Sequence, residues 1–389
     1  MKIIFVIDAL RQGGIRTSFF NLINNIDLNK YDISLFSFHI TEDDINQLPK
    51  GLNVILPNSL FDLAASTGEE VYKKSKSKYF FRKCLALACK VFNSDRIYDI
   101  IFKTENRKFN YDVAISFTNN VGDHSLYFGS NKFVLNKISS KKKISWIHAN
   151  YEAMNLDTNI NNNEYNDFDK IIAVSEETKD QFLKFNEEKR NKVCVIYNLI
   201  NKKQLNIKSN ENIDINISNN LLNFITISRI DENKDLSKAI DISLYLKSKG
   251  LKFKWLILGD GPLLEQLIEK TNSYKLNDCI EWYGYVNNPY PLLKQSDLYI
   301  STSKSEGYSL SIVEALFFSI PVLCGYYPSA KECISNESGW IINNNVSSYC
   351  EFLQDLINNK KILFDKKRTV SILHENEEIL TKFEEVLNG

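Results

Sequence analysis

The residues from Ser301 to Pro321, STSKSEGYSLSIVEALFFSIP, combine two carboxylates with a helix start. The stretch follows an apolar run, and its second half has apolar side chains at helical spacing, which predicts strand, loop and helix. Glu306 then lies in the loop and Glu314 lies inside the helix. Unpaired N–H groups and the helix dipole attract phosphate at such a helix start. The stretch predicts a site for a phosphorylated, hydroxyl-rich ligand; an ordinary turn with two solvated glutamates is the alternative.

Two cations follow another strand-like run, in the sequence SRIDENK from Ser228 to Lys234. Arg229 suits bidentate phosphate recognition, and Lys234 supplies a mobile point charge. Together they could neutralise a diphosphate leaving group. The alternative is a solvated loop in which neighbouring acids pair with both cations.

Glycines also follow strands. Gly13-Gly14 comes after the first strand, where glycine lets the backbone approach a ligand closely, although a plain turn has the same composition. The fingerprint G-x-G-x-x-G is absent there, and the later stretch from Gly259 to Leu264, GDGPLL, lacks its third glycine. A pyridine-nucleotide dehydrogenase is therefore disfavoured.

Two rings complete the set of candidates. His148 ends a strand-like run, where a neutral imidazole could hydrogen-bond a sugar hydroxyl or stabilise developing charge, although a lone histidine is more often structural. Tyr285 precedes Asn288-Pro289-Tyr290-Pro291 and could stack on a nucleobase, whereas we assign Tyr290 to the core. Each ring follows a strand, and we expect ligands at the carboxyl ends of the strands.

The elements that position these residues alternate, which favours parallel sheets with helices on both faces. A polar stretch without sustained periodicity, 201–222, predicts a linker between domains at 1–200 and 223–372. In tandem doubly wound domains, ligands bind beyond the carboxyl ends of the strands. The expected strands cover 2–8, 32–38, 52–56, 112–117, 142–148, 170–175 and 192–198 in the first domain. Those of the second cover 224–230, 254–261, 279–286 and 297–303.

Composition limits the remaining classes. The 389 residues exceed one ordinary core and fit two or three domains. Basic and acidic residues balance at 48 each, so the total charge gives no support for a nucleic-acid partner. We expect no transmembrane helix, a first strand rather than a signal peptide in MKIIFVIDAL, and reduced thiols for the seven cysteines. These features predict a cytoplasmic protein.

Together these motifs resemble the retaining, nucleotide-sugar-dependent glycosyltransferases of family 4. The resemblance rests on Arg229 with Lys234, on LGDGP at Leu258–Pro262, on Glu306 with Glu314, and on the Gly-Gly loop. It is continuous from about residue 224 to 342. Three features depart from the family pattern and leave details of nucleotide and sugar recognition open: Ser228, Asp235, and the loop 325–330, which lacks the usual Gly pair before Glu332.

The resemblance implies the GT-B architecture, with two Rossmann-like doubly wound α/β domains facing across a cleft. Residues 1–200 would bind the acceptor, 223–372 would bind the donor, and a helix over about 373–389 would cross back to the first domain. In the family, cations matching Arg229 and Lys234 hold the diphosphate, a glutamate matching Glu306 meets the sugar, and one matching Glu314 binds ribose. We therefore expect catalytic roles for Arg229, Lys234, Glu306 and His148, and donor contacts from Gly13, Gly14, Tyr285, Gly307, Tyr308, Ser309, Leu310, Ser311 and Glu314.

The implied activity is hexosyl transfer with retention, from a nucleoside-diphosphate sugar, with a UDP-sugar expected, to a glycan in cell-surface polysaccharide or glycolipid synthesis. No metal ion and no cofactor are implied, because the nucleotide-sugar is a substrate. Two rival functions share the fold: a nucleotide-sugar epimerase, and a non-catalytic homologue that binds glycan or nucleotide. Acid and base carboxylates for the epimerase are not identified in the first domain.

A basic segment concerns the acceptor. Residues 72–90 hold seven basic and no acidic residues, beside aromatic and aliphatic side chains that extend to Phe92. Such a segment suits an anionic membrane surface, and a packed helix with a solvated basic face is the alternative. If residues 72–92 bind the inner face of the cell membrane, the acceptor is expected to be a lipid-linked glycan.

Overall fold

The computed structural model describes residues 1–11, 13–119, 124–126, 129–152, 154–213, 215, 217, 220–367 and 369–389, apart from the side chain at position 364. Positions 214, 216, 218 and 219 of the predicted linker lie outside the described residues. The chain divides into two compact units. Unit 1 contains 1–199 and 376–389, and unit 2 contains 200–375.

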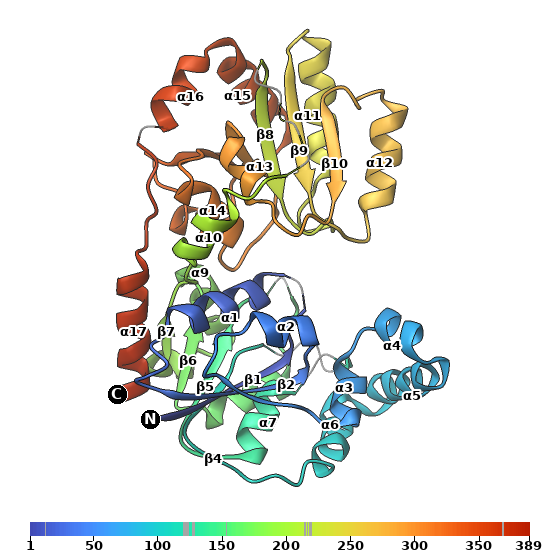
Figure 1. Cartoon of the computed structure of the whole chain (residues 1–389), viewed down its shortest axis with the longest axis vertical. Helices are drawn as coiled ribbons and strands as arrows, with labels where there is room; N and C mark the ends of the chain where they lie inside the picture. The colour runs from blue at the N-terminus through green and yellow to red at the C-terminus, as the bar shows by residue number, and fades with distance from the viewer. Residues whose placement is uncertain are drawn as a thin grey trace. The chain divides into compact units, whose positions relative to one another are not determined.

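Unit 1 is built on a seven-stranded parallel sheet in the order β3-β2-β1-β4-β5-β6-β7 (Figure 1). Its strand interiors are almost continuously buried, as expected when helices cover both faces of a parallel sheet. The order reverses between β1 and β4, which creates a switch point at the carboxyl edge. The strands are β1 (Lys2–Ala9), β2 (Asp32–His39), β3 (Asn53–Ile55), β4 (Phe109–Ser116), β5 (Ile138–Ile147), β6 (Lys170–Ala173) and β7 (Val193–Val195).

Aromatic rings fill the core of unit 1. Phe36 of β2 stacks on Phe133 with ring centroids 4.7 Å apart, and Phe61 and Phe102 stack at 5.6 Å. The helices are α1 (Gly14–Asn25), α2 (Glu42–Gln47), α3 (Ser59–Ala65), α4 (Gly68–Lys74), α5 (Lys76–Phe92), α6 (Ser94–Lys103), α7 (Ser130–Lys137), α8 (Asn159–Glu164), α9 (Glu176–Leu183) and α17 (Asn376–Asn388), with 3-10 turns η1 (Tyr165–Asp167) and η2 (Glu187–Lys192). Helix α1 begins at Gly14, within the Gly-Gly pair that the sequence places after the first strand.

The end of the chain belongs to unit 1. Phe383 of α17 contacts Trp146 of β5 with ring centroids 5.7 Å apart, and Lys30 forms an ion pair with Glu384 at 2.7 Å. Asn376 donates a hydrogen bond to Asn25 at 3.2 Å. These contacts pack α17 beside the strands of unit 1 (Figure 1), so a helix does occupy the C-terminal segment.

Unit 2 repeats the topology with six parallel strands in the order β10-β9-β8-β11-β12-β13. Its switch point lies between β8 and β11. The two units therefore confirm the predicted α/β class of two doubly wound, Rossmann-like domains. The strands are β8 (Leu222–Ile227), β9 (Phe253–Leu258), β10 (Ile280–Gly284), β11 (Leu298–Ser301), β12 (Val322–Gly325) and β13 (Gly339–Ile342). The helices are α10 (Lys202–Lys208), α11 (Ser237–Ser248), α12 (Leu264–Ser273), α13 (Tyr290–Gln295), α14 (Leu310–Phe317), α15 (Val346–Asn358) and α16 (Lys360–Lys367), with the 3-10 turn η3 (Pro328–Glu332).

Helix α10 lies inside the segment predicted as a linker. Its C-terminal carbonyl at Lys208 accepts a hydrogen bond from Asn288 at 2.8 Å, and Lys294 of α13 donates to Asn210 at 2.9 Å. The beginning of the segment is thus a helix of unit 2 rather than an unstructured connection. The sequence did not predict this helix, because its seven residues are mostly polar and too few to show a helical period.

The glycines of the LGDGP motif pack two strand ends together. A Cβ atom at Gly261 would lie 2.3 Å from the carbonyl oxygen of Ile230, and one at Gly259 would lie 1.8 Å from that of Ser228. Ile230 N–H donates to the Asp260 carbonyl at 2.9 Å, which holds the chain after β8 against the loop after β9. The motif therefore positions the segment that carries Arg229.

We expect Gly261→Ala to destabilise unit 2 by about 1–3 kcal/mol, because the added methyl group meets backbone that cannot rotate away. Urea denaturation with a probe in unit 2 measures this loss. Gly14→Ala is the matched control, because its Cβ would have nothing within 4 Å. Equal stability of the two variants would contradict the packing role of Gly261.

Candidate functional site

Two loops meet at the switch point of unit 2, one after β8 and one after β11. Asn233 donates to the Ser305 carbonyl at 2.8 Å, and its own carbonyl accepts from Lys304 N–H at 2.8 Å. Thr302 Oγ1 donates to the Lys234 carbonyl at 2.7 Å. These bonds join segments about seventy residues apart, and they fix where the side chains of both loops point.

Lys234 and Glu306 form an ion pair between these loops. Their side chains are only 19% and 15% exposed, so solvent screens the pair weakly. Ser303 Oγ donates a second hydrogen bond to Glu306 Oε1 at 2.8 Å. Two of the predicted catalytic residues are thus brought together, and each holds the other in the geometry seen here.

Arg229 is placed differently. Its side chain is 70% exposed, and its Nε lies 3.6 Å from Asp231 Oδ2. The other oxygen of Asp231 accepts hydrogen bonds from the N–H groups of Asn233 and Lys234, at 3.1 and 3.2 Å. The predicted cationic pair therefore consists of one exposed cation beside Asp231 and one cation neutralised by Glu306.

Glu314 lies in the second turn of α14 and is buried, as is the apolar face of the helix around it. Burial raises the pKa of Glu314 to about 7, although a hydrogen bond from Tyr290 opposes that rise. Tyr290 Oη lies 3.2 Å from Glu314 Oε1. The protonated form of this carboxyl group is accordingly accessible near neutral pH, and in that form the group can donate as well as accept hydrogen bonds.

Tyr290 itself is a residue that sequence reasoning assigned only to the core. Its ring does pack against Phe318 at 6.2 Å, but its hydroxyl bonds the carboxyl group of Glu314. Tyr290 follows β10, at the same sheet edge as the other candidates of unit 2. That position could have identified Tyr290 as a candidate site residue from the sequence.

The start of α14 gathers small hydroxyl side chains. Tyr299 Oη lies 2.8 Å from Ser311 Oγ, and the hydroxyls of Ser309 and Ser311 are 3.4 Å apart. Ser309 is the N-cap, yet its side chain forms no capping bond to the described helix. Gly307, Tyr308 and Leu310 complete this turn, and the last two are buried. The predicted strand, loop and helix from Ser301 to Pro321 are confirmed.

Tyr285 follows β10 and is 53% exposed. The structure thus leaves the ring on the surface of unit 2, where one of its faces could stack on a planar group. No described contact of this ring contradicts the stacking hypothesis, and none tests it.

Unit 1 carries the remaining candidates. Gly13 has φ of 143°, a conformation that favours glycine, and it forms the N-cap of α1. Among the described residues, nothing lies within 4 Å of a Cβ added at Gly13 or Gly14, and both glycines are exposed. The helix start is therefore open on this side, which leaves room for a ligand.

His148 follows β5 at the carboxyl edge of the sheet in unit 1. Burial lowers the pKa of His148 to about 3, so the ring is neutral at neutral pH. Its ring lies 4.6 Å from that of Phe117 and is stacked 5.8 Å from that of Trp146. Among the described residues its buried Nε2 has no hydrogen-bond partner. A neutral imidazole with an uncommitted nitrogen fits a hydrogen-bonding role and not a cationic one.

Among the described residues, no group of three or more His, Cys, Asp or Glu side chains could hold a metal ion. The chain contains one Asp-x-Asp sequence, at Asp167 and Asp169, immediately before β6. Asp169 accepts a hydrogen bond from Lys143 N–H at 2.7 Å. It lies at the amino end of the strand, which is the edge opposite to ligand sites in this fold.

Residues 208–370 match the model of the family described as glycosyl transferases group 1. One relative is WcaL of Escherichia coli K12, whose name describes it as a colanic acid biosynthesis glycosyltransferase. WcaL is 29% identical to this chain over 133 residues, which cover 32% of this chain and 33% of WcaL. An N-acetylgalactosamine-N,N'-diacetylbacillosaminyl-diphospho-undecaprenol 4-alpha-N-acetylgalactosaminyltransferase of Campylobacter jejuni is 26% identical over 171 residues, 43% of this chain and 45% of that protein. The chain thus spans about a third to less than half of the length of these curated relatives.

The fold also matches solved structures. A crystal structure of Staphylococcus aureus TarM, in complex with fondaparinux, alpha-GlcNAc-glycerol and UDP, superposes with a TM-score of 0.67 and 14% identity, and the match covers 100% of both chains. At this identity the likeness concerns the fold. It confirms the predicted GT-B architecture.

The raised pKa of Glu314 predicts a pH dependence of stability. Because the folded value of about 7 exceeds the ordinary value of 4.5, the folded state holds this proton more tightly than the unfolded chain. This contribution is fully present below pH 4.5 and is lost as the pH rises through 7. It amounts to at most about 3 kcal/mol.

Thermal denaturation of the wild type and of Glu314→Gln, at pH 5 and pH 8, measures this effect. We expect the variant to gain stability relative to the wild type at the higher pH. Glu337→Gln, at an exposed position, provides the control and should show no such difference. A constant difference between wild type and Glu314→Gln would show that Glu314 is not perturbed.

Proposed function

We propose that this protein is a retaining glycosyltransferase that transfers a hexosyl group from a nucleoside-diphosphate sugar, with UDP-sugar as the expected donor, to a glycan acceptor. The observation that carries the proposal is the Lys234–Glu306 pair at the switch point of unit 2. In doubly wound sheets generally, phosphorylated ligands bind at this switch point. The group 1 match over 208–370 includes all of these residues and supports the assignment.

The donor diphosphate would lie against Lys234 and Arg229. Lys234 is already desolvated and oriented by Glu306, so little reorganisation is needed when an anion arrives. Arg229 is exposed and can close over the phosphates as a bidentate donor. The N–H groups from Gly307 to Ser311 would add the field of the α14 start.

The sugar and the ribose would be bound by the two glutamates. Glu306 would accept hydrogen bonds from sugar hydroxyls while Lys234 balances its charge. Glu314, which can both donate and accept near neutral pH, suits vicinal ribose hydroxyls. Tyr285 would stack on the base. In unit 1, Gly13 and Gly14 would approach the phosphates, and neutral His148 would hydrogen-bond the sugar.

In the proposed reaction, the bond between the anomeric carbon and the diphosphate oxygen breaks first, and its electron pair leaves with the nucleoside diphosphate. The cations stabilise that charge as it develops. The acceptor hydroxyl attacks the oxocarbenium-like carbon from the face that the leaving group vacates, which retains configuration. Its proton passes to a phosphate oxygen of the leaving group. Neither a protein base nor a metal ion is needed.

For the acceptor, we infer a lipid-linked glycan used in cell-surface polysaccharide or glycolipid synthesis, with peripheral binding to the cytoplasmic face of the membrane through residues 72–92. The Campylobacter jejuni relative, whose name specifies a diphospho-undecaprenol acceptor, supports this class. The name of WcaL likewise refers to the biosynthesis of a polysaccharide.

Replacing the cations tests the donor site. We expect Arg229→Ala and Lys234→Ala to lower the release of UDP from a UDP-sugar panel by about 10²-fold or more, because each removes charge opposite the leaving group. Lys252→Ala, an exposed lysine of the same unit, should leave the rate unchanged. Wild-type rates in both cation variants would refute the proposed role.

Lys234→Ala also leaves Glu306 without its cation, which can unfold the loop. The double variant Lys234→Ala with Glu306→Gln removes that cost and separates folding from catalysis. We expect it to fold like the wild type, as judged by circular dichroism and thermal denaturation, and to stay inactive. The donor panel also distinguishes the rival functions, because an epimerase would yield an isomerised sugar and a non-catalytic protein would leave every donor intact.

Retention and metal independence are tested with the transferred product. Proton NMR of the new linkage should show the anomeric configuration of the donor, and EDTA should leave the rate unchanged. Inverted product would exclude attack from the vacated face, and full loss of activity with EDTA followed by recovery with a divalent cation would exclude the metal-free mechanism.

A further inference from the structure

The outer surface of α5 carries an apolar stripe that no described residue covers. Phe80, Leu87 and Val91 are 70%, 62% and 64% exposed. Together with exposed Cys84 they are spaced four, three and four residues apart, which places all four on one side of the helix. Soluble proteins rarely leave a continuous row of large apolar side chains in water.

Lysines run along one side of this stripe. Lys76, Lys83 and Lys90 are exposed and seven residues apart, so they form a second row next to the first. On the other side of the stripe lie Phe81 and Phe92, which are also exposed. We call the apolar stripe, the lysine row and these two rings the α5 face. Every charged side chain of α5 is basic.

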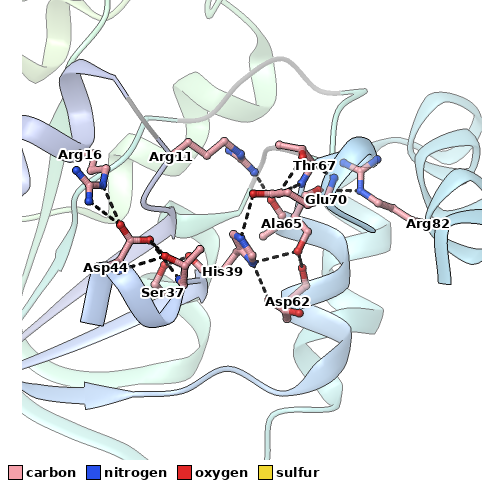
Figure 2. A network of polar contacts seen from close by, with 12 residues as sticks. Arg11, Arg16, Ser37, His39, Asp44, Asp62, Ala65, Thr67, Glu70 and Arg82 are labelled. Carbon is pink, nitrogen blue, oxygen red and sulfur yellow. Dashed lines mark hydrogen bonds and ion pairs between the residues drawn. The ribbon is translucent and has the colours of Figure 1, made fainter. Parts of the chain in front are cut away.

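The opposite side of α5 is firmly attached to unit 1, so the α5 face cannot turn inward. Cys89 is fully buried in the core, and Arg82 donates from Nε to the Ser66 carbonyl at 2.8 Å. The neighbouring residues form the network in Figure 2. There His39, at the end of β2, bonds Asp62 of α3 at 2.6 Å and lies 3.8 Å from Glu70 of α4.

The hydrogen-bond partners in this network determine which atoms of Ser66 and His39 donate. Ser66 Oγ donates to the Asp62 carbonyl at 2.6 Å, so the Nδ1 of His39 must supply the proton for its bonds to Asp62 and to Ser66 Oγ. Glu70 is held in turn by the N–H and hydroxyl of Thr67, at 2.7 and 2.8 Å. Helices α3, α4 and α5 are therefore fixed to the end of β2, and α4 and α5 lie at the periphery of unit 1 (Figure 1).

We propose that the α5 face docks unit 1 on an anionic lipid bilayer. Its lysines match the phosphates of acidic headgroups, and its phenylalanine and aliphatic side chains reach the acyl boundary beneath them. Docking of a second copy of the chain is disfavoured by the same charges, because both copies would bring only basic charged side chains of α5 to the contact. The inference deepens the proposed function, since a bilayer is where a lipid-linked acceptor is presented.

Cys84 provides a direct probe, because it lies within the stripe and is the exposed cysteine of the seven. We expect an environment-sensitive dye on Cys84 to shift to shorter wavelength with vesicles of phosphatidylglycerol and phosphatidylcholine, and not with phosphatidylcholine alone. A dye on Lys50→Cys in a Cys84→Ser background, also on the surface of unit 1, should show no shift. No shift at Cys84 with anionic vesicles would overturn the proposal.

Sedimentation with the same vesicles measures affinity. We expect Leu87→Glu with Val91→Glu, and separately Lys83→Glu with Lys90→Glu, to weaken binding by about tenfold or more, and added salt to weaken binding of the wild type. Lys50→Glu should bind like the wild type. Wild-type binding by both double variants, or equal binding to neutral vesicles, would contradict the assignment.

Two further measurements separate the alternatives. If the wild type is a dimer in analytical ultracentrifugation and Leu87→Glu with Val91→Glu is a monomer, the α5 face is a protein interface and the lipid assignment is wrong. Vesicle binding needs no donor, so Lys234→Ala should bind vesicles normally and the α5 variants should still release UDP from the donor. Failure of either proposal would therefore leave the other measurable.

Discussion

The candidate donor site depends on one constraint, which is the closure of two strand-end loops over the reversal of strand order in unit 2. In a parallel sheet the strands on either side of the reversal send their loops in opposite directions, and the space between them must be filled by side chains or by a ligand. Asn233, Ser305 and Thr302 fill part of it with hydrogen bonds. The Lys234–Glu306 pair then lies on a fixed frame, and its charges are held in place before any ligand arrives.

That frame explains why the charged groups differ in environment. Lys234 and Glu306 neutralise each other where water is scarce, which keeps two charges stable in a partly buried place. Arg229 lies largely in solvent, with its Nε 3.6 Å from Asp231 Oδ2. Glu314 forms no ion pair among the described residues, and its burial raises its pKa, which the hydrogen bond from Tyr290 and the charge of Lys208 offset only in part. Three different environments for charged groups thus occur at one sheet edge.

Unit 1 supplies contacts of another kind. His148 is neutral because its ring lies among aromatic side chains, and the start of α1 is open beside Gly13 and Gly14. On the periphery of the unit, the helices α3 to α5 are fixed inside by a polar network and present apolar and basic side chains outside. No helix in the described part of the chain is long and apolar enough to cross a membrane.

The sequence determined the features that depend on neighbours along the chain. Alternating apolar runs gave the doubly wound class, and the strand, loop and helix around Glu306 follow from local periodicity. The resemblance also pointed to GT-B, which the structural comparison confirms. Tertiary structure alone decided which groups share a partner, because burial and pairing depend on segments far apart in sequence. The tertiary structure joins Lys234 to Glu306, leaves Arg229 exposed and raises the pKa of Glu314 by burying it. It also places α10 in unit 2, and it directs Arg82 of α5 inward while the lysines of that helix stay on the surface.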